Sequence, residues 1–239
     1  MYVGGNHHNH NGGKPTGMFF GYRIAVEDFN GDGRDDVVIG AFGIISREPH
    51  NYMEFVPESY IVYLSGDDGL LHDSSDSIEG QENGATMPDM GFAHDLATGD
   101  IDGDGDIDIA AIGNTEAVLF KNDGSGEFGE KEVISSEIAR GSHITGGDFD
   151  QDGDMDLVTV SSLETFVVDY SVAWSENDGV ANFGYQNGLI SSDNPAIYAL
   201  VADVDEDGFP DIVTVSFNGE EVQLFTNSLT PIMTFDALE

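Results

Sequence analysis

One nine-residue pattern, D-x-[DN]-x-D-G-x-x-D, occurs four times and restricts the possible folds more than any other feature of the chain. The copies span 28–36, 100–108, 148–156 and 203–211, so their starts are 72, 48 and 55 residues apart. Each copy stands between two short apolar runs rich in β-branched residues, which predicts a strand, an acidic loop and a second strand. A repeat of this kind is one supersecondary unit that must stack on its neighbours to bury its apolar faces.

A second signal follows each of the first three acidic loops, where an apolar stretch ends in a glycine-rich acidic turn. These stretches are 60–69 (YIVYLSGDDG), 117–126 (AVLFKNDGSG) and 171–179 (SVAWSENDG). Asp-Gly supplies the positive φ that a tight hairpin turn needs. One repeat is therefore predicted to be a four-stranded antiparallel meander of about 50 residues, the unit of a propeller blade. No stretch has a sustained 3.6-residue apolar period, so we expect few helices.

The predicted fold is all-β: a β-propeller of four-stranded antiparallel blades, with about four blades in this chain. The blades are expected at roughly 19–90, 91–139, 140–193 and 194–239, within a single domain that spans 19–239. Residues 1–18 are interpreted as a leader or as a strand that closes the array.

Two irregularities in the repeat need separate explanations. The first interval is the longest, and an insertion loop at 44–58, which contains two prolines, accounts for it. The fourth repeat has no Asp-Gly turn after Phe225, so its last strand is expected to be short, atypical or absent. Residues 231–238 or the N-terminal leader are the candidates to supply that strand, because a propeller protects its strand edges.

Charge and composition exclude several classes of function. The chain has seven Lys plus Arg against 46 Asp plus Glu, and its formal net charge is −39. Such a surface repels nucleic acid and anionic membranes, so we expect neither as a partner. The absence of cysteine excludes disulfides and zinc–thiolate sites. No apolar run is long enough to insert into a membrane, and no signal peptide is visible in the sequence.

The acidic loops supply the oxygen ligands that a hard cation requires. Calcium takes roughly six to eight oxygens, and the loops offer side-chain oxygens at positions one, three, five and nine, a glycine at six and a backbone carbonyl at seven. An EF-hand loop opens in the same way, but it needs a Glu at position twelve and flanking helices. Here position twelve holds Ile39, Ala111, Thr159 and Thr214, which excludes an EF-hand.

We therefore predict about four Ca²⁺ ions, one in each loop. The residues at position seven would contribute their backbone carbonyls, and the others would contribute side chains. The predicted ligands are Asp28, Asn30, Asp32, Arg34, Asp36, Asp100, Asp102, Asp104, Asp106, Asp108, Asp148, Asp150, Asp152, Asp154, Asp156, Asp203, Asp205, Asp207, Phe209 and Asp211.

These repeats resemble the FG-GAP or VCBS-type repeats found in the integrin α-subunit propeller and in many microbial surface proteins. In the first repeat Phe20-Gly21 opens the inner strand, and Gly40-Ala41-Phe42 follows the loop where the motif has Gly-Ala-Pro. The later repeats lack the full Gly-Ala-Pro and are more similar to the VCBS variant. The resemblance implies a calcium-stabilised propeller, extracellular or on the cell surface, that serves in adhesion, in carbohydrate binding or as a scaffold. Family propellers usually have about seven blades, whereas this chain has four repeats.

A ligand rim is the second candidate site. Tyr22, His94, His143 and Tyr198 each precede an acidic loop by five or six residues. If the strand before each loop is the innermost of its blade, these side chains gather near the opening of the central channel. They would form a polar and aromatic rim for a sugar or a peptide, although ordinary strand-end residues are the alternative. Trp174 is expected in the core.

The sequence favours a non-enzymatic function, because neither Gly-x-Ser-x-Gly nor His-Glu-x-x-His occurs and no catalytic residue stands out. We predict a calcium-stabilised extracellular binding or adhesion module that recognises carbohydrate or protein. The alternatives are a polysaccharide-degrading enzyme on a propeller scaffold and a structural spacer of a larger surface protein. A homodimer and a longer chain both remain open as the state of assembly.

Overall fold

The computed structural model describes residues 15–47, 52–66, 71–73, 95–113, 115–136, 138, 141–161, 170–184, 187–191, 196–216, 222–228 and 234–237. These residues form sixteen strands, β1 to β16, and no helix. Accordingly, the described part of the chain contains no helix that is long and apolar enough to cross a membrane. The expectation of an all-β fold is confirmed.

The strands make four antiparallel sheets, each of four strands that are adjacent in both sequence and space. The first sheet contains β1 (Pro15–Glu27), β2 (Asp36–Arg47), β3 (Tyr52–Ser65) and β4 (Leu71–Asp73). The second contains β5 (Asp95–Gly99), β6 (Asp108–Ile112), β7 (Ala117–Phe120) and β8 (Glu132–Ser135). The third contains β9 (Gly141–Gly147), β10 (Asp156–Ser161), β11 (Tyr170–Ser175) and β12 (Asn187–Ser191). The fourth contains β13 (Ala196–Ala202), β14 (Asp211–Ser216), β15 (Val222–Ser228) and β16 (Thr234–Ala237).

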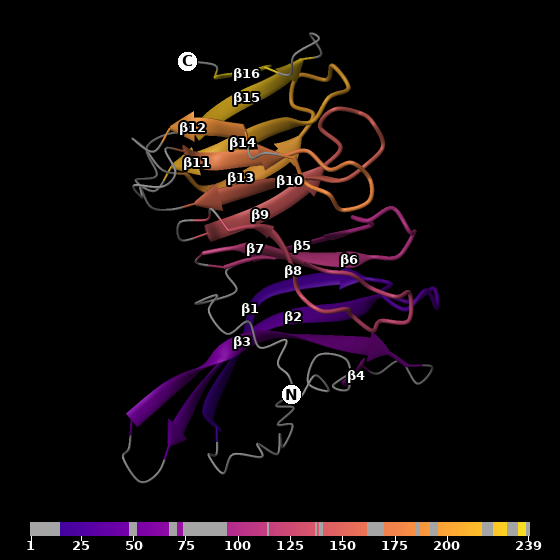
Figure 1. Ribbon diagram of the computed structural model, residues 1–239, viewed down its shortest axis with the longest axis vertical. Helices are drawn as coiled ribbons and strands as arrows, with labels where there is room; N and C mark the ends of the chain where they lie inside the picture. Colours follow the sequence, from indigo (N-terminus) through magenta and orange to yellow (C-terminus); the bar gives the residue numbers. More distant parts are fainter. Residues whose placement is uncertain are drawn as a thin grey trace.

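The four sheets are stacked face to face as consecutive propeller blades (Figure 1). The strand that precedes each acidic loop is the innermost strand of its blade, and β1, β5, β9 and β13 contact one another in that order. Figure 1 places the first and fourth blades at opposite ends of the molecule, so the four blades form an open array. The predicted blade type and blade number are confirmed.

Three apolar clusters lie between consecutive blades and form the core. The cluster between the first two blades includes Phe29, Val38 and Phe120. The next includes Ile101, Leu119 and Leu157, and the last includes Phe149, Trp174 and Phe225. Because each cluster takes side chains from two blades, a blade buries its apolar faces only by stacking, as the repeat pattern requires. Trp174 is 7% exposed and belongs to the core, as expected.

The outward faces of the two end blades are apolar and exposed. Phe29, Ile101 and Phe149, at the second position of the first three loops, are almost fully buried against the next blade. Val204 occupies that position in the fourth blade and is 47% exposed. On the opposite end face, Ile24 of β1 is also exposed. No described residue covers these two faces.

The structure corrects the prediction of an insertion loop at 44–58. β2 and β3 form a long hairpin in which Ile44 pairs with Phe55 and Arg47 pairs with Tyr52, so the described part of this segment is strand. The register shifts after Val56, where Pro57 has no N–H to donate to a ladder. The extra residues therefore lengthen a hairpin, because the segment is rich in β-forming residues despite its prolines.

The first and last described segments each contribute a strand to an end blade. β1 begins at Pro15, inside the expected leader of residues 1–18. In the fourth blade β16 pairs with β15, with Ser228 opposite Thr234 and Phe225 opposite Ala237. The expected candidate segment 231–238 therefore contains the last strand of its own blade.

Candidate functional site

The acidic loops share one backbone conformation. The glycine at position six has a positive φ in all four loops, between 84° at Gly33 and 101° at Gly153, which confirms its predicted part in the sharp turn. Position four is also left-handed, and there the first two loops have glycine. The last two loops hold Gln151 (φ 60°) and Glu206 (φ 61°) at position four, a conformation that costs a residue with a Cβ about 1–2 kcal/mol.

Side-chain hydrogen bonds within each loop hold the carboxylates inward. The N–H of the sixth-position glycine donates to the first-position aspartate, for example Gly33 N to Asp28 Oδ2 at 2.8 Å. The N–H at position seven donates to the fifth-position aspartate, as from Asp106 N to Asp104 Oδ1 at 2.9 Å. The same two bonds occur in all four loops. The first loop adds an ion pair between Arg34 and Asp32 at 2.6 Å.

Three of the loops bring carboxylates together at the spacing that one metal ion needs. Within each of these groups one oxygen per residue lies within 4.8 Å of the others. Calcium–oxygen distances of roughly 2.3–2.6 Å allow two ligands of one ion to lie up to about 5 Å apart. The donor set therefore fits Ca²⁺. The groups are Asp100, Asp102 and Asp108, then Asp148, Asp150 and Asp152, and finally Asp203, Asp205 and Asp211.

The other predicted ligands keep their positions in the loops, and their binding to an ion stays a prediction. In the first loop Asn30 takes the third position, and its Oδ1 accepts a hydrogen bond from Asp32 N at 3.0 Å. The seventh-position residues Arg34, Asp106, Asp154 and Phe209 were expected to ligate through their carbonyls, which stays a prediction. The predicted count of about four ions likewise stays a prediction.

The ninth-position aspartates are fully buried and join each loop to the rest of its blade. Asp108 accepts hydrogen bonds from the N–H groups of Ile101, at 3.1 Å, and of Asn122, at 2.8 Å. Asp36, Asp156 and Asp211 make the equivalent bonds in the other blades. A ninth-position carboxylate therefore fixes the distance between the acidic loop and the end of the third strand.

A buried asparagine at the end of the third strand links each of the last three blades to the preceding blade. Asn122 Nδ2 donates to Phe29 O at 2.7 Å, and Asn177 Nδ2 donates to Ile101 O at 2.7 Å. Asn227 makes the same bond to Phe149 O. The sequence contained this signal, because an Asn stands at the end of each of these three strands, but the sequence analysis did not assign it a contact between blades.

The loops concentrate negative charge, and the pKa values of several of their carboxyls are raised. Partial burial, followed by repulsion from Asp104 and Asp100, raises the pKa of the Asp106 carboxyl. Burial and then repulsion from Asp152 and Asp148 raise the pKa of Asp154 in the same way. Burial is the main cause that raises the pKa values of Asp108 and of Asp156 to about 6. A divalent cation in the loops would compensate this excess of negative charge.

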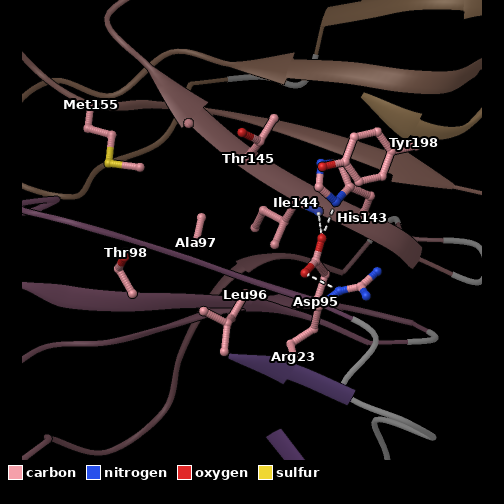
Figure 2. Close-up of a pocket in the computed structure, with 11 residues that line it drawn as sticks. Arg23, Asp95, Leu96, Ala97, Thr98, His143, Ile144, Thr145, Met155 and Tyr198 are labelled. Atoms are coloured by element: carbon pink, nitrogen blue, oxygen red, sulfur yellow. Dashed lines mark hydrogen bonds and ion pairs between the residues drawn. The ribbon is translucent and has the colours of Figure 1, made fainter. Parts of the chain in front are cut away.

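A pocket of about 400 Å³ lies across the inner strands of all four blades. Arg23, Asp95, His143 and Tyr198 form a row along one side of it, one residue from each blade (Figure 2). Each stands five residues before the first aspartate of the acidic loop in its blade. Toward the other end of the pocket lie Thr98 and Met155 (Figure 2).

The row is held together by contacts between neighbouring blades. Asp95 is buried, and its Oδ1 accepts a hydrogen bond from Arg23 Nε at 2.5 Å. Its Oδ2 lies against Nδ1 of His143, whose imidazole in turn stacks on Tyr198 with the ring centroids 4.1 Å apart. Figure 2 shows the Asp95 carboxylate between the Arg23 guanidinium and the His143 imidazole. One chain of polar and aromatic contacts therefore crosses four inner strands.

Two of the four residues predicted for the ligand rim, His143 and Tyr198, lie in this pocket. His94 and the side chain of Tyr22 lie outside the described residues. In the first two blades the structure places Arg23 and Asp95 in the row. Counting five residues back from each loop would have found them, whereas Tyr22 and His94 are six residues back.

Register shifts next to the pocket explain why the regular alternation of side chains along a strand does not predict which residues line the pocket. The β1–β2 register shifts between Phe20 and Ile24, which encloses Arg23. The register of β9 shifts just before His143, and that of β13 shifts just before Tyr198. Bulges of this kind re-aim side chains and occur often beside functional sites.

The fold and the loops together define a class of protein, a propeller-type array of antiparallel blades that each carry an acidic loop. Comparison with protein families is consistent with this class. An FG-GAP-like repeat family matches residues 100–159, and an FG-GAP repeat family matches residues 20–43. Both matched segments are therefore FG-GAP-type repeats.

Among solved structures, the chain is similar to a lectin from Agrocybe aegerita, studied for its specific recognition of non-reducing terminal N-acetylglucosamine. The TM-score is 0.53 over 90% of this chain, with 15% sequence identity. This chain spans 65% of the length of the lectin chain. At that identity the likeness concerns the fold alone.

Proposed function

We propose that this protein is a calcium-stabilised extracellular binding module that recognises carbohydrate. The observation that carries the calcium part is the convergence of three carboxylates in each of three loops, within 4.8 Å of one another. Only oxygen ligands converge there, and calcium is the cation that prefers a large, flexible set of such ligands.

Calcium at these sites stabilises the array. Extracellular calcium modules bind with dissociation constants of about 10⁻⁴–10⁻³ M, which suits an environment where calcium is abundant. At about a hundredfold excess over the dissociation constant, one site stabilises the folded state by about 2.7 kcal/mol. Several such sites equal the whole stability of an ordinary domain, about 5–15 kcal/mol. The calcium-free protein is accordingly marginal.

Carbohydrate is favoured over protein as the ligand for two reasons. The similar lectin recognises a terminal sugar, and the inner strands of this chain enclose a small pocket with an aromatic side chain and several polar groups. Pockets of about 300–1,000 Å³ suit small ligands, whereas protein partners bind to broader surfaces. A polysaccharide-degrading enzyme and a structural spacer remain the rivals.

A glycan array probed in calcium separates these functions. We expect retention of one or a few related glycans that are recovered unchanged, and loss of binding when calcium is chelated because the array then loosens. Cleavage of the retained glycans would identify an enzyme. Failure to retain any glycan in calcium would overturn the carbohydrate proposal and leave a spacer or a protein-binding module.

The exposed end faces support a second part of the proposal, that the array is completed by another blade. A second copy of the chain and further blades of a longer chain are the two sources of such a blade. In either case the blade would cover Val204 and its apolar neighbours on the fourth blade, or Ile24 on the first blade.

A further inference from the structure

We propose that the inner-strand pocket is the carbohydrate site and that it takes one neutral sugar ring, with Tyr198 as its aromatic platform. This inference rests on the proposed function and names the site and ligand class for it. The pocket volume of about 400 Å³ lies near the lower end of the range for small-ligand pockets, which suits a terminal sugar better than the interior of a long chain.

The walls of the pocket are built on strands of adjacent blades. Asp95 and Thr98 come from β5, His143 and Thr145 from β9, and Tyr198 from β13. Sites carried by strands are positioned more rigidly than sites carried by loops, so little ordering is needed when a ligand binds. The row of Arg23, Asp95, His143 and Tyr198 lies five residues before the acidic loops, whereas the other end of the pocket, at Thr98 and Met155, reaches those loops.

Tyr198 supplies the apolar surface that a sugar ring needs. One face of its ring stacks on His143, and the residue is 45% exposed because β13 belongs to an end blade. Aromatic rings with a polar tip combine an apolar face with a hydrogen-bonding group, and such residues are common in binding sites. The C–H face of a pyranose fits against such a ring.

Arg23 supplies the polar group that orients the ring, and Asp95 holds Arg23 in place. The guanidinium group carries N–H donors in a fixed plane that suits sugar hydroxyls, whereas the buried Asp95 carboxylate is already engaged by Arg23, His143 and Ile144 N. The charges of Arg23 and Asp95 compensate each other, because Arg23 Nε lies 2.5 Å from Asp95 Oδ1. With a net charge of −39 on the chain, this balanced pair favours a neutral sugar over a uronate.

His143 provides an independent indication that a ligand group is expected here. Its Nδ1 faces the Asp95 carboxylate and so carries the hydrogen in the neutral ring, which leaves Nε2 as an acceptor. Nε2 is buried and has no hydrogen-bond partner among the described residues. A sugar hydroxyl that donates to Nε2 would supply the partner that this buried acceptor lacks.

The test is a titration of the whole chain in calcium with N-acetylglucosamine, glucose, galactose and glucuronate, followed by amide NMR. We expect at least one neutral sugar to shift the signals of Thr98, Thr145 and Gly146, which line the pocket, and glucuronate to bind more weakly than glucose. The variants Tyr198→Ala and Arg23→Gln should each weaken binding about tenfold or more, equivalent to about 1.4 kcal/mol. Tyr198→Phe should keep most of the affinity because it keeps the ring.

Val222→Ala is the matched control, because Val222 is 71% exposed on β15 and does not line the pocket. It should bind like the parent, and its unfolding curve together with those of the other variants identifies any variant that fails to fold. A sugar that binds the parent and the Tyr198→Ala variant equally would overturn the pocket assignment while leaving the proposed carbohydrate function intact. If no sugar in the titration and no glycan on the array binds, the proposed function fails, and the pocket assignment fails with it.

Discussion

Asn177→Ala should destabilise the protein strongly although Asn177 is not one of the predicted calcium ligands. Asn177 is 1% exposed, and its Nδ2 donates to two carbonyls, Ile101 O of the preceding blade at 2.7 Å and Met155 O at 3.1 Å. Truncation leaves the buried Ile101 carbonyl without this donor, at about 1–3 kcal/mol, and the part-buried Met155 carbonyl as well, at a smaller cost. The buried Oδ1 of Asn177 has no partner, so its removal offsets part of that cost. We expect a net loss of about 2–4 kcal/mol.

Chemical denaturation in saturating calcium measures this loss, with Asn182→Ala as the control. Asn182 lies in the same turn but is exposed, and its Nδ2 donates only to Asp178, at 2.9 Å. Its replacement should change the free energy of unfolding by less than about 0.5 kcal/mol. A loss below that value for Asn177→Ala would refute the idea that the buried asparagines hold neighbouring blades together. The size of the loss matters, because an ordinary domain has only about 5–15 kcal/mol of stability.

Three further outcomes are expected. Burial raises the pKa of Asp108 and Asp156 from 3.8 to about 6. In chelator these carboxyls therefore hold protons in the folded state that they release on unfolding. The free energy of unfolding should then fall as the pH rises from about 4 to 6. Calcium needs the ionised carboxylates, so its affinity should rise over the same interval; titrations below and above pH 6 that gave equal affinities would contradict this. Glu206→Gly should raise the free energy of unfolding by up to about 1 kcal/mol, because glycine adopts the φ of 61° without strain, and Glu206→Gln, which removes only the charge, should not reproduce the whole gain. Light scattering in calcium should detect self-association that decreases in Val204→Ser, since Val204 lies on an uncovered end face; a strict monomer at all concentrations would exclude association between copies.

Much of the fold was predictable because the repeat combines two local signals that agree. The acidic pattern fixes a loop with glycine at the left-handed sixth position, and the apolar runs on both sides fix two strands. The long β2–β3 hairpin was misread as a loop because prolines usually end strands. Here Pro57 sits at a register shift, where its missing N–H interrupts no ladder bond.

The candidate sites were predictable to different degrees. Ligand positions within an acidic loop are close in sequence, so their convergence follows from the loop itself. The pocket depends on four strands that come together only after stacking, and on bulges that shift the faces of β1, β9 and β13. His143 and Tyr198 were found because each lies five residues before its acidic loop, as every residue of the row does. The ion pair of Arg23 with Asp95 was missed because it joins residues 72 positions apart in the sequence. The asparagine contacts between blades have the same long-range character.

The most direct test of the account is a calcium titration by calorimetry, paired with thermal unfolding in calcium and in chelator at low salt. The account predicts about four bound ions and a clear fall in the melting temperature when calcium is removed, because the converging carboxylates then repel one another. The variant Asp104→Ala should lose one ion and part of the stabilisation. Two or fewer ions in saturating calcium, or equal melting temperatures in calcium and chelator, would contradict the claim that calcium holds these blades together.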